Sequence, residues 1–407
     1  MVLGFPGSGI RSEVVLPASK SISNRVLVIR ALSGSGMKIE NIAVCDDTDV
    51  MVRALEEVKE VYDVGHAGTS MRFLTAFLAM QGRTSVLTGS ERMKHRPIKV
   101  LVDALNAIGA DISYLEEEGF PPLKINGKRP AGGEVEVSAE VSSQYISALM
   151  MAAPYMEKGL VIRLEGHIAS RTYIGMTVGI MRQCGVEVEF EGNEIRIRPG
   201  AYRNRVFRVE SDWSAASYFF EILSILGAGR IVMAGLEKDS LQGDSGQVAL
   251  WKRLGVDCSF SSEGVVITGN GECGQDIEYD FNLMPDLVQS FAVACCMKGV
   301  RFRFTGVETL RIKETDRIAA LERELKKLGF VLSVEGDRAI AWNGERCRAD
   351  AVPEIDTYKD HRMAMAFAPA SMFSDQGIVI NDCRVVTKSF PDFWEVLASI
   401  GFSVSES

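Results

Sequence analysis

The chain has 407 residues, which is more than one hydrophobic core usually serves, because single cores stop growing near about 250–300 residues. Hydrophobic residues make up 46% of it and charged residues 24%, as in ordinary globular proteins. The formal net charge of −9 argues against a nucleic-acid-binding surface, which usually needs a basic face. It does not exclude anionic small substrates, because a local basic cleft can lie in an acidic protein.

The eight cysteines form no Cys-x-x-Cys pair and have no histidine at metal-ligand spacing. We therefore expect small buried side chains in a reducing compartment rather than a metal or redox role, which is the alternative. Residues Met1–Ser12 do not combine a basic stretch with an apolar run, so no signal peptide is predicted. No apolar segment approaches the length of about 20 residues that spans a bilayer. The sequence predicts a cytoplasmic protein without membrane contact.

An amphipathic helix that ends at a glycine and is followed by a short alternating strand recurs along the chain. The glycines are separated by 76, 70, 74 and 72 residues and are Gly109, Gly185, Gly255, Gly329 and Gly401. Apolar residues three and four apart give each helix one buried stripe, and glycine accepts the left-handed conformation at the helix end. A degraded copy at Met51–Val58 lacks its glycine and part of the segment that follows. A chance recurrence of a common helix–glycine–strand unit is the alternative.

Six copies of this length are modules of domains rather than solenoid repeats, which run about 20–50 residues. Three modules in each of two domains is the natural division. The boundary is expected near Glu210, between the third and fourth modules. Residues Val206–Glu210 are typical of a strand, and Ser211 and Asp212 are suited to cap a helix that begins near Trp213.

In the first half, polar or cationic residues precede apolar helices, where free N–H groups and the helix dipole favour anions. These are Lys20, Ser21 and Arg25 at the helix predicted for 23–32, Gly68 and Arg72 near 73–80, Arg96 before 98–108, Ser142, Ser143 and Gln144 before 146–156, and Ser170 and Tyr173 in the third module. Thr69 and Ser70 can cap the second of these helices. The alternatives are solvated helix starts, plain capping by one serine, and a solvated charge run at Arg92–Pro97.

The second half repeats this arrangement. Asp286 precedes a helix predicted for 287–297, where a carboxylate is ordinarily a cap. Glu314 is flanked by Lys313 and Arg317 before a helix at 318–328, so it could move a proton while the cations hold anions. An exposed salt-bridged face is the alternative for this segment. Arg362 stands at the start of a very apolar helix, and Lys388 follows a strand near the chain end, where a lysine is usually solvated.

Several of these segments together resemble the EPSP synthase family, and they occur in family order from residue 16 to about 393. They are Lys20–Arg25, Ala67–Thr69, Arg96–Pro97, Ser142–Gln144, Lys313–Arg317 and Asp360–Met363. The resemblance implies an α/β (α+β) fold of two similar domains, each of three βαβαββ repeats with helices packed inside sheets and an active-site cleft between them. It assigns residues 1–17 and 210–407 to one discontinuous domain and 18–209 to the other.

The resemblance also implies transfer of the enolpyruvyl group of phosphoenolpyruvate to the 5-hydroxyl of shikimate 3-phosphate, with release of phosphate and no cofactor or metal. The residues that would bind shikimate 3-phosphate are Lys20, Ser21, Arg25, Ser142, Ser143, Gln144, Ser170, Tyr173, Asp286 and Lys313. Those that would bind phosphoenolpyruvate are Lys20, Gly68, Arg96, Gln144, Arg317, Arg362 and Lys388. Asp286 would accept the hydroxyl proton, and Glu314, with Lys20, would move the proton of the methylene carbon. We expect a monomer that binds neither nucleic acid nor membrane.

Three positions depart from the family pattern: His66 and Thr309, where asparagine is usual, and Ala18, where glycine is usual. Two other functions are possible. The related enolpyruvyl transferase for UDP-N-acetylglucosamine carries a reactive cysteine in its corresponding loop, whereas Gly89–Pro97 contains none and Lys20 is followed by serine. A catalytically inactive binding protein would not need to retain Asp286, Glu314 and Lys20.

Overall fold

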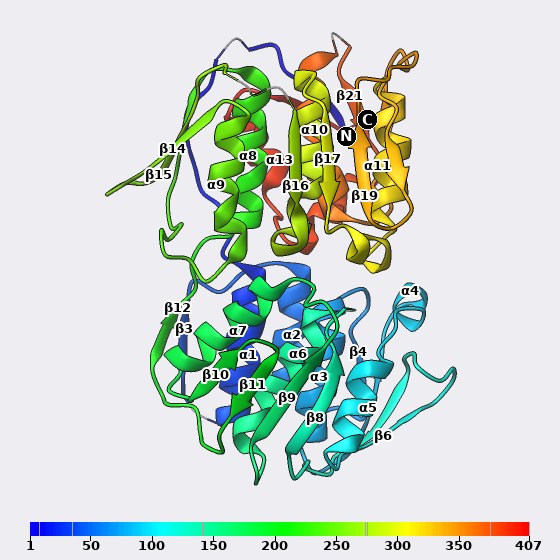
Figure 1. Ribbon diagram of the computed structural model, residues 1–407. Helices are drawn as coiled ribbons and strands as arrows, with labels where there is room; N and C mark the ends of the chain where they lie inside the picture. Colours follow the sequence, from blue (N-terminus) through cyan, green and yellow to red (C-terminus); the bar gives the residue numbers. More distant parts are fainter. Residues whose placement is uncertain are drawn as a thin grey trace. The chain divides into compact units, whose positions relative to one another are not determined.

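The computed structural model (Figure 1) describes residues 1–7, 9–34, 36–140, 142–272, 274, 276–374 and 376–406. The chain divides into two compact units. Unit 1 consists of Met1–Pro17 and Glu210–Ser407, and unit 2 is Ala18–Val209. Helices and strands alternate in both units, so the expected mixed α/β class is confirmed. No helix within the described ranges has the length and apolar character needed to cross a membrane.

Each unit is built from three modules. The fourth module consists of β2 (Arg11–Val14), α8 (Trp213–Leu226), β13 (Arg230–Met233), α9 (Gln247–Arg253), β14 (Val256–Ser261) and β15 (Gly264–Gly269). The fifth consists of β16 (Ile277–Asp280), α10 (Val288–Lys298), β17 (Phe302–Thr305), α11 (Arg317–Lys327), β18 (Ser333–Glu335) and β19 (Ala339–Trp342). The sixth consists of β20 (Glu354–Ile355), α12 (His361–Phe367), β21 (Ile378–Ile380), α13 (Phe393–Ser399), β22 (Ser403–Ser405) and β1 (Val2–Gly4). Short 3-10 helices join these elements at η2 (Gly243–Gly246), η3 (Phe281–Leu283), η4 (Pro285–Leu287), η5 (Glu308–Ile312), η6 (Ala368–Phe373) and η7 (Cys383–Lys388).

Unit 2 contains the first three modules. The first consists of α1 (Lys20–Ser33), β3 (Lys38–Glu40), α2 (Asp46–Glu56) and β12 (Val206–Arg208). The second consists of β4 (Val61–Asp63), α3 (Gly68–Ala79), β5 (Thr84–Thr88), α4 (Glu91–Lys94), α5 (Lys99–Ala107), β6 (Asp111–Tyr114) and β7 (Leu123–Asn126). The third consists of β8 (Gly133–Ser138), α6 (Ser143–Ala152), η1 (Ala153–Tyr155), β9 (Leu160–Glu165), α7 (Arg171–Gln183), β10 (Val188–Glu191) and β11 (Glu194–Ile197).

Modules two to six share one sheet topology. A parallel pair of strands is extended by an antiparallel hairpin whose second strand lies next to the pair, as in the order β4-β5-β7-β6 and the order β16-β17-β19-β18. The first module is reduced to the parallel pair β3 and β12, in agreement with the degraded copy in the sequence. The predicted strand at 206–210 is β12.

The N-terminal strands belong to unit 1. β2 pairs in parallel with β13 and completes the fourth sheet, while β1 lies between β21 and β22 and completes the sixth. The first seventeen residues therefore supply strands to two modules whose other strands lie more than two hundred residues away in sequence.

The five predicted glycine caps are confirmed, since all five glycines have φ between 82° and 108°. At Gly255 an added Cβ would also lie 1.9 Å from the carbonyl oxygen of Glu272, so the chain approaches itself closely there. The expected cap of α8 is confirmed as well: Asp212 Oδ1 accepts hydrogen bonds from the amides of Ser214 at 2.8 Å and Ala215 at 3.4 Å. The helix expected at 146–156 instead ends at Ala152 and continues as a 3-10 turn, because Pro154 has no amide hydrogen.

Several helices are buried on nearly all sides, which is the property of a helix inside a domain. Figure 1 shows α8 and α10 running side by side in unit 1, and both helices are buried over most of their length. Trp251 stacks on Phe291 with ring centroids 3.9 Å apart, in the core between α9 and α10. Helices α1, α3 and α6 have the same character in unit 2. Residues at the ends of these helices are the candidates for function.

Candidate active site

In unit 2, polar contacts of two predicted residues, Lys20 and Gln144, link the starts of the central helices. Lys20 is the first residue of α1, and its Nζ pairs with Asp47 Oδ2 of α2 at 3.0 Å, with both side chains largely buried. Gln144 Nε2 of α6 donates to Thr69 Oγ1 of α3 at 3.2 Å. The N-terminal turns of four helices, which carry partial positive charge, are thus linked through side chains.

Arg25 is the buried cation of this group, with 2% of its surface exposed. Its guanidinium donates to Thr177 Oγ1 at 2.8 Å, Ser147 Oγ at 3.3 Å and the carbonyl oxygen of Ser21 at 2.8 Å. No ion pair to Arg25 is found in the part of the chain that the structure describes. Burial lowers the pKa of Arg25 to about 10, because nearby charge offsets little of the desolvation. A buried cation with neutral partners favours an anionic ligand.

Arg96 lies against the backbone of Gly68, where an added Cβ would be 2.5 Å from Nη1 of the guanidinium. The Arg96 side chain is buried, and its Nε has no hydrogen-bond partner among the described residues. Arg72 holds the segments of Gly68 and Arg96 together. It donates hydrogen bonds to the carbonyl oxygen of Gly68 at 3.2 Å and to that of Pro97, the residue after Arg96, at 3.1 Å. A glycine at 68 therefore permits a cation and a helix start to meet, which suits a phosphate or carboxylate.

The remaining predicted residues of unit 2 lie at the starts of α6 and α7. Ser142 caps α6 by accepting from the amide of Gln144 at 3.3 Å, so the simple capping alternative holds for this residue, and Ser143 begins the helix. Ser170 precedes α7 in the left-handed conformation, with φ of 55°. The Tyr173 ring lies 6.0 Å from the Arg25 guanidinium carbon, which joins α7 to the buried cation.

In unit 1, Arg317 is the centre of the site. Its guanidinium donates to Asp360 Oδ2 at 2.7 Å, Asp286 Oδ1 at 2.9 Å and Glu314 Oε2 at 3.1 Å. Arg317 and Asp360 are buried, while Asp286 and Glu314 remain partly exposed. The three carboxylates raise the pKa of Arg317 above its ordinary value although burial alone would lower it. Arg317 therefore organises three acidic side chains from three segments.

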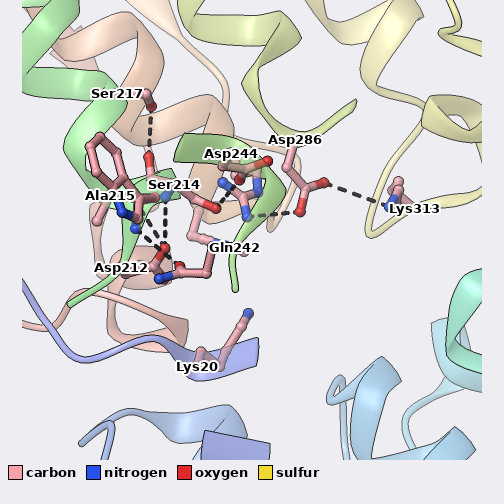
Figure 2. Close-up of polar contacts among 12 residues, drawn as sticks. Lys20, Asp212, Ser214, Ala215, Ser217, Gln242, Asp244, Asp286 and Lys313 are labelled. Atoms are coloured by element: carbon pink, nitrogen blue, oxygen red, sulfur yellow. Dashed lines mark hydrogen bonds and ion pairs between the residues drawn. The ribbon is translucent and has the colours of Figure 1, made fainter. Parts of the chain in front are cut away.

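Asp286 is surrounded by cations. It pairs with Arg362 Nη2 at 2.9 Å through Oδ2 and with Lys313 Nζ at 3.6 Å through Oδ1, in addition to Arg317 (Figure 2 shows the Lys313 contact). Burial alone would raise the pKa of Asp286, but Arg362, Lys313 and Arg317 outweigh it and hold that pKa well below its ordinary value. In this state Asp286 is an ionised carboxylate and a weak base.

Glu314 bridges two cations, since Oε2 accepts from Arg317 and Oε1 pairs with Lys388 Nζ at 3.4 Å. The alternative that Lys388 is solvated is wrong, because its side chain is only 9% exposed. Four cations thus come together around these carboxylates: Lys313, which follows η5, Arg317 of α11, Arg362 of α12 and Lys388 of η7. The group combines a binding surface for anions with two carboxylates that could exchange protons.

Asp244 is a further carboxyl beside Asp286, as Figure 2 shows. It is buried in η2 and accepts a short hydrogen bond from Ser214 Oγ of α8. Burial, and then the negative charge of Asp286, raise the pKa of Asp244 from 3.8 to about 7. Two neighbouring carboxyl groups therefore have pKa values shifted in opposite directions, which separates a proton-holding group from an ionised one.

Some expectations about single residues are wrong. Thr69 and Ser70 do not cap α3, whose N-cap is Ala67. Asp286 caps no helix, because its carboxylate is directed to cations instead. Within Arg92–Pro97 the basic residues separate: Lys94 pairs with Glu116 at the surface, while Arg96 is buried.

Sequence reasoning missed the acidic partners Asp47, Asp244 and the ion-pairing role of Asp360. Asp47 lies in the first turn of α2 and Asp360 caps α12, and such positions ordinarily hold an acidic residue for the helix alone. Only the burial of the carboxylates, which the sequence does not show, distinguishes them.

No cluster of three or more His, Cys, Asp or Glu side chains that could hold a metal ion occurs in the described ranges. Seven cysteines are free thiols, and the eighth, Cys273, lies outside the described residues.

Comparison with known proteins gives one consistent result. The family model described as EPSP synthase (3-phosphoshikimate 1-carboxyvinyltransferase) matches residues 6–64 and 56–397. The chain is 46% identical over 398 residues to 3-phosphoshikimate 1-carboxyvinyltransferase of Bacteroides fragilis, which covers 98% of this chain and 97% of that protein. It is 38% identical to the protein of that name from Photobacterium profundum, over 97% of each chain. A solved structure of EPSP synthase from Acinetobacter baumannii has the same fold, with a TM-score of 0.78, 23% identity and 99% coverage of both chains.

Proposed function

The chain belongs to the EPSP synthase family, and from that premise we propose which of its side chains bind the substrates and move the protons. The reaction transfers the enolpyruvyl group of phosphoenolpyruvate to the 5-hydroxyl of shikimate 3-phosphate and releases phosphate, in the shikimate pathway of aromatic amino-acid biosynthesis. Both substrates carry phosphate and carboxylate groups, so the site needs several cations. The alcohol is a poor nucleophile and the enol needs protonation, so acid–base groups are needed as well.

Shikimate 3-phosphate is bound in unit 2 by Ser21, Arg25, Ser142, Ser143, Ser170 and Tyr173, with Lys20 and Gln144, and in unit 1 by Lys313 and Asp286. Arg25 supports this assignment, because its burial among hydroxyl and carbonyl groups leaves a positive charge without a carboxylate among the described residues. The hydroxyls around it orient a phosphate without adding charge.

Phosphoenolpyruvate is bound by Lys20, Gly68, Arg96 and Gln144 of unit 2 and by Arg317, Arg362 and Lys388 of unit 1. The observation that supports Arg96 is its buried Nε, which lacks a partner among the described residues beside the Gly68 helix start. A planar guanidinium offers two parallel hydrogen bonds to a carboxylate or phosphate, which a lysine cannot reproduce.

Asp286 accepts the proton of the 5-hydroxyl. In the resting arrangement its cations hold the pKa too low for an effective base. Bound anions would compete for Arg362, Arg317 and Lys313, and each hydrogen bond withdrawn from Asp286 would raise its pKa. Substrate binding therefore activates this base by removing the charges that stabilise its ionised form.

Glu314, assisted by Lys20, adds the proton to the methylene carbon and removes it again after attack. Its two oxygens are held by Arg317 and Lys388, which fixes their direction. The same cations stabilise negative charge as phosphate leaves the tetrahedral intermediate. The Glu314 position between two cations is the observation that best supports this assignment.

The test is phosphate release from purified protein with each substrate alone and with both. We expect release only when both are present. Glu314→Gln should reduce turnover by about a hundredfold or more, because acid–base groups contribute that much, while shikimate 3-phosphate still binds in isothermal titration.

The control is Glu335→Gln, which makes the same substitution at an exposed residue of β18 that pairs with Arg303 of β17 in the same sheet. Its turnover should match wild type. Equal turnover in the Glu314 and Glu335 variants would remove Glu314 from the mechanism. Absence of release from folded wild-type protein at saturating substrates would favour a binding protein instead.

The assembly and location are also proposals. The net charge of −9 supports a protein that does not bind nucleic acid, and we expect a cytoplasmic monomer. Light scattering after gel filtration tests the monomer, since the chain mass is 44.6 kDa.

A further inference from the structure

The connection between β20 and α12 contains two consecutive residues in the left-handed conformation, Tyr358 with φ of 53° and Lys359 with φ of 59°. Both have a Cβ, which makes this conformation unfavourable, and it persists only where the surroundings hold it. The next residue, Asp360, caps α12, and Arg362 follows with its guanidinium on Asp286. The unfavourable turn thus lies directly before two charged residues of the site.

Glu324, which is fully buried on α11, holds this turn. Its Oε1 accepts from Tyr358 Oη at 2.5 Å, and its Oε2 accepts from the amide of Asp356 at 3.0 Å. Burial, and then the carboxylate of Glu324, raise the pKa of Tyr358 to about 12, so the phenol keeps its proton and donates it. Lys327 Nζ joins the group at 2.8 Å from Glu324 and 2.9 Å from Asp356.

The same helix holds the far end of the turn. Arg317 of α11 donates to Asp360 Oδ2 at 2.7 Å, and Glu324 lies seven residues later. Residues seven apart lie on one face of a helix, about 10 Å apart along its axis. Helix α11 therefore fixes the connection at two points, on either side of the left-handed pair.

We infer that Tyr358 and Glu324 are positioning residues that hold the left-handed turn and thereby set the orientation of Asp360 and Arg362. The inference rests on the proposed function only for the ligand of Arg362, phosphoenolpyruvate. A loosened turn lets Arg362 move away from its position beside Asp286, so phosphoenolpyruvate binding weakens first.

The first test is Tyr358→Phe, which removes one hydroxyl and keeps the ring. We expect the KM for phosphoenolpyruvate to rise roughly tenfold, the size expected when a hydrogen bond to a buried charged group is lost. The KM for shikimate 3-phosphate should change much less. The control is Tyr279→Phe, since the Tyr279 hydroxyl has no hydrogen-bond partner among the described residues. Equal KM values for phosphoenolpyruvate in the two variants would overturn the inference.

A second substitution tests whether the hydroxyl acts through the turn. Glycine adopts the left-handed conformation without a Cβ clash, so Lys359→Gly makes the turn favourable without the Tyr358–Glu324 hydrogen bond. The double variant Tyr358→Phe, Lys359→Gly should recover most of the lost affinity, while Lys359→Gly alone stays near wild type. A double variant no better than Tyr358→Phe would overturn the inference.

Amide hydrogen exchange provides a readout that needs no turnover. The amides of Asp360 and Arg362 are hydrogen-bonded to Thr357 O and Asp360 Oδ1, both at 2.9 Å. Peptides covering 356–363 should exchange faster in Tyr358→Phe than in wild type or Tyr279→Phe. Unchanged exchange would show that the Tyr358–Glu324 hydrogen bond does not hold the turn. If wild-type protein released no phosphate, the proposed function would fail while exchange would still decide this inference.

Discussion

Arg25 and Arg317 are both buried guanidinium groups, but their neighbours differ in charge. Arg317 contacts three carboxylates, which raise its pKa, and it acts as a fixed internal counterion. Arg25 contacts hydroxyl and carbonyl oxygens, and burial lowers its pKa to about 10. Burying a cation without a counterion is costly, so a phosphate that reaches Arg25 gains more than one that reaches Arg317. Arg25 is therefore suited to binding alone, whereas Arg317 both binds an anion and organises the acidic side chains around it.

Asp244 leads to a prediction about pH. Its pKa is raised from 3.8 to about 7 in the folded protein, so the folded state keeps a proton that the unfolded state loses. The free energy of unfolding should therefore fall as pH rises from about 4 to about 7, by about 1.4 kcal/mol per pH unit from this group. Asp244→Asn removes this dependence. Urea denaturation across this range should show that the free energy of unfolding of Asp244→Asn increases relative to that of wild type as pH rises.

The matching control is Asp257→Asn, because Asp257 is an exposed carboxylate on β14 of the same unit. Its difference from wild type should not vary with pH. A pH-independent difference for Asp244→Asn would contradict the assignment of a retained proton to this carboxyl.

At the scale of elements, one carboxylate caps two amides at the start of α8. Asp212 accepts from two amides of a helix that is buried along nearly its whole length. Asp212→Ala should lower the free energy of unfolding by about 0.5–2 kcal/mol, the usual range for a lost N-cap. Urea denaturation near neutral pH measures this.

Asp392→Ala is the comparison, because Asp392 is the N-cap of α13 but makes no side-chain cap hydrogen bond. We expect its effect to stay within about 0.5 kcal/mol of wild type. Equal losses in both variants would mean that the cap bonds of Asp212 contribute nothing of their own.

The sequence predicted elements better than contacts. Helix ends marked by glycine, and the Asp212 cap, depend on neighbours in sequence and were predicted correctly. The pairing of Arg317 with Asp360, 43 residues away, depends on how modules pack, so no local pattern shows it. The left-handed conformation of Tyr358 and Lys359 could not be predicted, because neither residue is a glycine. A hydrogen bond to Glu324 of α11, rather than the conformational preference of the residues themselves, holds the turn.

At the scale of the whole molecule, the module pattern predicts which fragments fold. Residues 18–209 contain all the strands of unit 2, so we expect this fragment to fold alone. Residues 210–407 lack β1 and β2, and the absence of β1 leaves β21 and β22 without the strand between them. That fragment should be unfolded or aggregated.

Circular dichroism melting and limited proteolysis of both fragments test this prediction. Addition of a peptide of residues 1–17 should restore a cooperative transition to 210–407, because it supplies both missing strands. A stable 210–407 fragment without the peptide would contradict the dependence on β1 and β2.

β1 pairs with β22, so the first and the last strand of the chain are neighbours in one sheet. Val2 and Ser405 are directly paired across β1 and β22, so the first and last strands form a hairpin that lacks only its connecting loop. In the fifth module the equivalent hairpin, β18 and β19, is continuous. The sixth module is therefore completed by one strand from each end of this sequence. A gene permuted to start at Ala18, with the old ends joined by a short loop, would encode the same sheets as two uninterrupted domains in succession.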